Sequence, residues 1–83
     1  METYLLIARS VTHAQRMARI LESCGIRAGM MRAPAGLSAN GCGYAVRIRS
    51  EHLASAHACL AKAELRPQGV FASDGTDYRE VVM

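Results

Sequence analysis

The order in which strand-like and helix-like patterns follow one another constrains the fold of this chain more than any other feature of its sequence. The continuous apolar run from Tyr4 to Ala8 is typical of a short central strand that is buried on both faces. Apolar residues then recur at helical spacing from Ala14 to Leu21, which predicts an amphipathic helix. Two more strand patterns, a second helix and a last strand complete the order β-α-β-β-α-β, that of the ferredoxin-like arrangement.

The first helix has both a start signal and a stop signal. Thr12 and Gln15 fit a capping box, in which the Thr12 hydroxyl accepts from an early backbone N–H and Gln15 reaches back. Gly25 is the residue type that helix ends prefer, and Ile26 can fold back onto the helix in the Schellman manner. We therefore expect a helix that begins at Thr12 and stops at Gly25.

The second half of the chain supplies three further elements after the strand 27–32. The stretch 44–49 alternates apolar and polar residues, as a half-buried strand does. Ser50 is a good N-cap for a second helix, and Pro67 ends that helical segment. A fourth strand is expected over 68–73.

These patterns predict one α+β domain over residues 1–83, with a core over 3–73 and a tail, 74–83, that can add an edge strand. The expected architecture is a ferredoxin-like β-α-β-β-α-β sandwich. Its four-stranded antiparallel sheet has the order 4-1-3-2, with the two helices on one face.

The first strand also bears on oligomeric state. It is apolar on both faces, whereas the helices of this fold cover only one face of the sheet. Apolar side chains would then be exposed on the open face beside Met31 or Phe71, and such a patch usually marks an interface. The side chains concerned are either Leu5 and Ile7 or Tyr4 and Leu6. We therefore expect a homodimer formed through the open face.

Composition limits the compartment and the partners. The formal charge of +3 comes almost wholly from arginines that are spread along the chain, which argues against a nucleic-acid interface. No apolar run approaches the roughly 18 residues that a membrane span needs, and Glu2 and Arg9 do not fit a signal peptide. Three cysteines, an odd number, do not suggest a disulfide framework. We expect a cytoplasmic protein with reduced thiols, in which Cys24 and Cys59 pack into the core.

Patterns for metal, cofactor or catalytic chemistry are weak. The sequence has no Cys-x-x-Cys, no histidine pair at i and i+4, and no glycine-rich phosphate loop before a helix. The acidic residues fit helix surfaces and turns. From these absences we expect a protein that has no cofactor and no metal and is not an enzyme.

Candidate site residues converge at one end of the predicted fold. The end of the first strand, the start of the first helix and the loop between the second and third strands share that end. Cys42 lies in this loop between two glycines, whose N–H groups can form an anion nest. A helix N-terminus and two arginines nearby would favour a thiolate. The residues expected around Cys42 are Arg9, Ser10, Thr12, His13, Arg32, Pro34, Ser38, Gly41 and Gly43.

Each of these assignments has a simpler alternative. Cys42 can be a small buried residue between turn glycines, and His13 can be a solvated residue of the first helical turn. The domain can be a non-catalytic interaction or regulatory module that dimerises through its open sheet face. It can also be a sensor that binds a small anion at Arg9 and Arg32.

Three stretches of the chain resemble a known family: Ser10–Ala14, Cys24–Ile26 and Pro34–Ser38, the last followed by Cys42-Gly43. Over about residues 3–73 the chain resembles the small bacterial proteins described as putative selenium/sulfur carrier protein-like. The resemblance implies that Cys42 carries reduced sulfur or selenium as a persulfide or selenenyl sulfide, in a loop shaped by Pro34, Ser38 and Gly43. It also implies two partners, a donor such as a cysteine desulfurase and an acceptor protein.

The chain departs from the family pattern next to its proline. Family members usually have a basic residue there, whereas this chain has Ala35, and the spacing from Ser38 to Cys42 is one residue longer. If the missing basic residue steadies an anion, Arg32 is the residue expected to replace it.

Overall fold

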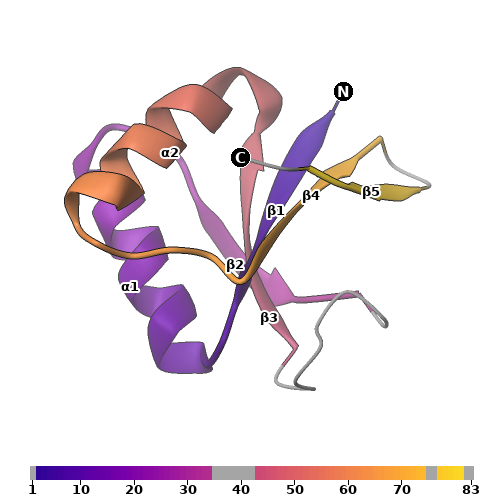
Figure 1. The fold of residues 1–83 in the computed structure, drawn as a ribbon, viewed down its shortest axis with the longest axis horizontal. Helices are drawn as coiled ribbons and strands as arrows, with labels where there is room; N and C mark the ends of the chain where they lie inside the picture. Colours follow the sequence, from indigo (N-terminus) through magenta and orange to yellow (C-terminus); the bar gives the residue numbers. More distant parts are fainter. Residues whose placement is uncertain (1, 35–42, 75–76, 82–83) are drawn as a thin grey trace.

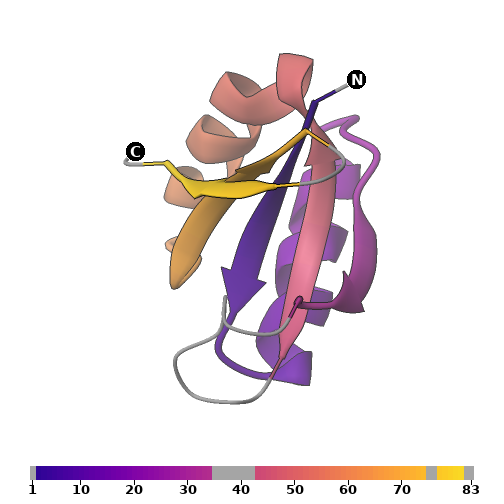
Figure 2. The ribbon, with the colours of Figure 1, turned by 90° about the vertical axis from the view of Figure 1, so that its right-hand side faces the viewer.

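Five strands form one antiparallel sheet, and two helices pack side by side on the same face of it (Figures 1 and 2). The structure is a computed structural model, and it describes residues 2–34, 43–74 and 77–81. In chain order, the elements are β1 (Thr3–Ala8), α1 (Val11–Ser23), β2 (Gly29–Arg32), β3 (Tyr44–Arg49), a 3-10 turn (Ser50–His52), α2 (Leu53–Lys62), β4 (Gly69–Ser73) and β5 (Tyr78–Glu80).

The strand order is β2-β3-β1-β4-β5, with β1 in the centre of the sheet between β3 and β4. The predicted α+β class with an antiparallel sheet and two helices is confirmed. The sheet has five strands rather than the predicted four, because β5, in the tail that was expected to be able to add an edge strand, pairs with β4.

The two faces of β1 enter two separate parts of the core. Leu6 and Ala8 face the helices and join the larger cluster, which includes Met17 and Leu21 of α1. On the opposite face, Leu5 and Ile7 pack with Ala45, and the partly buried Met31, Ala33 and Phe71 lie against them. Leu5 and Ile7 are each only 2% exposed, so the prediction that apolar side chains of β1 are left exposed on the open face is wrong. The single chain already buries them.

The start of α1 differs from the predicted capping box. Ser10, not Thr12, is the N-cap: its backbone is extended (φ −157°, ψ 169°), and its Oγ accepts a hydrogen bond from the N–H of His13 at 3.1 Å. Thr12 lies within the helix and is exposed. Serine and threonine can both cap a helix. Which of the two is the N-cap here depends on where the chain leaves β1 and turns into α1.

The end of α1 is as predicted. Gly25 has φ 80°, and its N–H donates to the carbonyl of Glu22 at 3.0 Å. The N–H of Ile26 donates to the carbonyl of Leu21, also at 3.0 Å, which completes a Schellman motif. Ile26 is buried in the same core cluster as Leu21, so the motif also turns the chain toward β2.

The second helix begins later than predicted. Residues Ser50–His52 form a 3-10 turn, and α2 starts at Leu53. Neither the turn nor α2 has a side-chain cap hydrogen bond, so the prediction that Ser50 caps this helix is wrong. No helix in the described part of the chain is long and apolar enough to cross a membrane.

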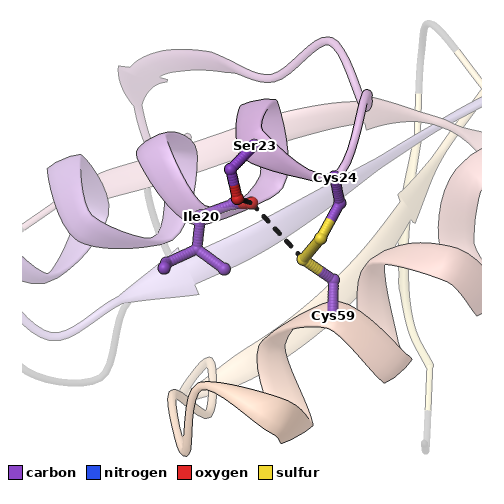
Figure 3. The surroundings of a disulfide bond; sticks show 4 residues. All are labelled: Ile20, Ser23, Cys24 and Cys59. Atoms are coloured by element: carbon purple, nitrogen blue, oxygen red, sulfur yellow. Dashed lines mark hydrogen bonds between the residues drawn. A yellow bond between two sulfur atoms is a disulfide. The ribbon is translucent and has the colours of Figure 1, made fainter.

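The structure also corrects the expectation of reduced thiols. Cys24, which follows the last residue of α1, forms a disulfide with Cys59 of α2 (Figure 3). The two cysteines are 35 residues apart, and the packing of the two helices against each other brings them together. Cys59 is buried in the core, as predicted, whereas Cys24 is exposed.

Candidate functional site

The end of β1, the start of α1, the end of β2 and the start of β3 lie at the same end of the molecule, in the lower part of Figures 1 and 2. Here the N–H of Ala33 donates to the carbonyl of Gly43 at 2.5 Å. This hydrogen bond links the chain before the segment 35–42 to the chain after it. Cys42, Ser38 and Gly41 belong to that segment and lie outside the described residues.

Gly43, directly after Cys42, has φ 71°. This is the left-handed region, which residues with a Cβ adopt at a cost. The glycine on this side of Cys42 is therefore needed for the backbone path into β3. Pro34, on the other side of the segment, is half-buried.

His13 is the most constrained of the predicted site residues. Its side chain is 6% exposed, and its Nδ1 accepts a hydrogen bond from the backbone N–H of Arg9 at 3.0 Å. Because Nδ1 is an acceptor, the neutral ring carries its proton on Nε2. Nε2 is buried and has no hydrogen-bond partner among the described residues. The alternative in which His13 is a solvated residue of the first turn is therefore wrong.

The electrostatic surroundings keep His13 neutral. Burial lowers the pKa of His13 below its ordinary value of 6.5, and the charges of Arg9 and Arg16 lower that pKa further. The imidazole is therefore an uncharged donor at neutral pH. The sequence interpretation missed Arg16, although its position three residues after His13 on the helix is a usable signal.

The two predicted arginines are placed differently. Arg9 is exposed and supplies the backbone N–H that orients His13. Arg32, at the end of β2, is exposed, and its guanidinium carbon lies 6.0 Å from the centroid of the Tyr44 ring. Tyr44 is the cross-strand partner of Arg32 in the register of β2 and β3. Arg9, Ser10 and His13 thus form one hydrogen-bonded set, and Arg32 belongs to a separate contact with Tyr44.

Two further features of the described residues bear on the kind of site. No group of three or more His, Cys, Asp or Glu side chains that could hold a metal ion occurs among the described residues. A pocket of about 530 Å³ lies between α2, β4 and the residues after β5, where Leu53, Leu60, Val70 and Val81 form part of its wall. The pocket includes none of the predicted site residues.

A protein-family model matches most of the chain. The family model described as "Putative Se/S carrier protein-like" matches residues 3–72. This range contains both helices, strands β1 to β3, the candidate site and all of β4 except its last residue, Ser73, whereas β5 lies outside it. No curated protein and no solved structure matches the chain.

Proposed function

Since the chain belongs to the Se/S carrier protein-like family, we propose that it carries reduced sulfur or selenium on Cys42 and delivers it to an acceptor protein. In the transfer, the Cys42 thiolate attacks the outer sulfur of a persulfide on the donor protein. An S–S bond forms at Cys42, the S–S bond of the donor breaks, and the donor thiolate leaves. Attack by an acceptor thiolate on the carried sulfur then regenerates Cys42. The protein turns over no substrate by itself.

The observation that supports this proposal is the buried Nε2–H of His13 at the N-terminus of α1, which has no hydrogen-bond partner among the described residues. A persulfide or a thiolate is an anion that needs hydrogen-bond donors. The N-terminus of a helix stabilises an anion by typically 0.3–1 kcal/mol, whereas lowering a thiol pKa by one unit takes about 1.4 kcal/mol. The helix alone is therefore too weak. A buried imidazole N–H at the same end of the fold is a second donor of the required kind.

The test is the mass of the intact protein after incubation with a cysteine desulfurase and cysteine. We expect a gain of one sulfur atom that a reducing agent removes and that Cys42→Ser abolishes. The double variant Cys24→Ser/Cys59→Ser is the matched control and should keep the gain, because it retains Cys42. A sulfur atom carried on Cys24 or Cys59, or no added sulfur at all, would contradict the proposal and favour the interaction-domain alternative.

A further inference from the structure

The Cys24–Cys59 disulfide lies away from the candidate carrier site. Cys24 follows the last turn of α1, whereas the carrier site lies at the first turn, and the 13 residues of the helix separate them by about 20 Å at 1.5 Å per residue. We propose that this pair is a second sulfur site, where thiol–disulfide exchange with a small thiol of the glutathione type begins at Cys24. The inference does not depend on the function proposed for Cys42.

The two sulfur-bearing residues are unequally exposed. Cys24 is exposed, whereas Cys59 is 7% exposed and belongs to the main core cluster. Thiol–disulfide exchange requires the incoming thiolate to reach one sulfur in line with the bond that breaks. Access therefore selects Cys24 as the residue attacked and Cys59 as the leaving thiolate.

A hydrogen-bond acceptor lies beside Cys59 that only the reduced form can use. Sγ of Cys59 lies 3.3 Å from the carbonyl oxygen of Ile20, and the hydroxyl of Ser23 donates to the same oxygen at 2.6 Å (Figure 3). A disulfide sulfur has no proton to donate. Once the bond is reduced, the Cys59 thiol can donate to Ile20 without moving away from the core. The reduced state thus gains a hydrogen bond that the oxidised state lacks.

The helices around the cysteine pair are also held together by contacts that do not involve sulfur. Leu21 of α1 and Ala56 and Leu60 of α2 are buried in one core cluster. The Schellman motif at Gly25 and Ile26 ends α1 through backbone hydrogen bonds that do not involve sulfur. Opening the disulfide therefore leaves a packed interface between the helices, so reduction does not require unfolding.

The exchange proceeds in two steps. A thiolate of the small thiol attacks Sγ of Cys24, a mixed disulfide forms there, and Cys59 leaves as a thiolate that takes a proton from water. A second thiolate then attacks the sulfur of the small thiol in the mixed disulfide and releases Cys24 as a thiolate. The protein disulfide gains two electrons, and two small thiols are oxidised to one disulfide.

The test uses the full chain carrying Cys42→Ser, so that no third thiol contributes. Reduced glutathione is added to the folded protein, free thiols are alkylated at intervals, and the mass of the protein reports its redox state. We expect a rate of reduction that does not change between 0 and about 1 M urea. A disulfide that opens only on global unfolding would be reduced roughly fivefold faster per molar urea, and that result would overturn the proposal.

The position of attack is tested with two matched variants in the same background. Oxidised glutathione should form a mixed disulfide with Cys24 in Cys59→Ser at least ten times faster than with Cys59 in Cys24→Ser. The secondary structure of both variants is checked by circular dichroism, and the urea series on the variant with both cysteines provides an independent readout if either variant fails to fold. Equal rates, or faster modification of Cys59, would contradict the assignment of Cys24.

Discussion

Arg9, Ser10 and His13 form a closed set of local hydrogen bonds where β1 leads into α1. The N–H of His13 donates to the Ser10 hydroxyl, and the imidazole accepts from the N–H of Arg9. Two backbone donors that the helix itself cannot satisfy are thereby paired with side chains. The same set orients the imidazole, so a residue that caps the helix also positions the buried donor of the candidate site.

Replacement of the N-cap tests this arrangement. Ser10→Ala should lower the free energy of unfolding by about 0.5–2 kcal/mol, because the N–H of His13 loses its acceptor. The matched control is Thr12→Ala, which removes the hydroxyl that the sequence pattern favoured but the structure leaves exposed. Urea denaturation of both variants measures the difference. A larger loss for Thr12→Ala would contradict the observed N-cap.

The lowered pKa of His13 predicts how stability depends on pH. As the pH falls through 6.5, the unfolded chain protonates this histidine while the folded chain resists protonation, so the free energy of unfolding decreases. Stability should therefore be higher at pH 7.5 than at pH 5.5. In His13→Asn, whose side-chain oxygen can still accept from Arg9, this part of the dependence should disappear.

The control for this pH prediction is His57→Gln, because His57 is exposed and lies on the other helix. Urea denaturation at several pH values gives the slope of the unfolding free energy against pH. The slope should be reduced more in His13→Asn than in His57→Gln. An unchanged slope in His13→Asn would show that other groups cause the dependence.

Among the secondary-structure elements, the disulfide joins the end of α1 to α2. It closes a loop of the chain that contains β2 and β3. Closing a loop of 35 residues restricts the unfolded chain, and disulfides of this kind typically contribute about 2–4 kcal/mol. The double variant Cys24→Ser/Cys59→Ser should therefore fold but be less stable than the oxidised protein by about that amount.

The measurement is urea denaturation of oxidised protein, reduced protein and the double variant. Reduced protein and the double variant should lie close together, because both lack the cross-link. Equal stability of all three forms would mean that the disulfide does not stabilise the protein by restricting the unfolded chain.

At the scale of the whole molecule, the open face of the sheet has fewer exposed apolar side chains than its sequence suggests. Leu5 and Ile7 are buried beneath a rim that includes Met31 and Phe71, which stay partly exposed. Association through this face stays a prediction. The contact between two chains would be made by the partly exposed residues of the rim. Light scattering at high micromolar concentration should give the mass of two chains, and a monomer there would contradict it.

A substitution localises the expected interface. Phe71→Asp should shift the protein toward the monomer, because it places a charge on the open face next to Leu5. Val11→Asp is the matched control, since it introduces the same charge at an exposed apolar position on the first turn of α1. If both variants or neither variant dissociated, the open face would not be the interface.

Features that depend only on neighbours along the chain could be predicted from the sequence. The apolar run of β1, the helical spacing before Leu21 and the stop at Gly25 are local patterns, since periodicity and glycine conformation act within a few residues. The site prediction named Ser10 and His13 for the same reason: both lie in the turn where a strand leads into a helix.

Features that join residues far apart in the chain are set by the folded structure. The Cys24–Cys59 bond needs two helices to pack across 35 residues, and β5 becomes a strand because β4 offers it a free edge. His13 is neutral because the fold buries its side chain. The helix that carries His13 would not bury it alone. Burial and pairing are properties of the assembled sheet and helices, and no window of the sequence contains both partners.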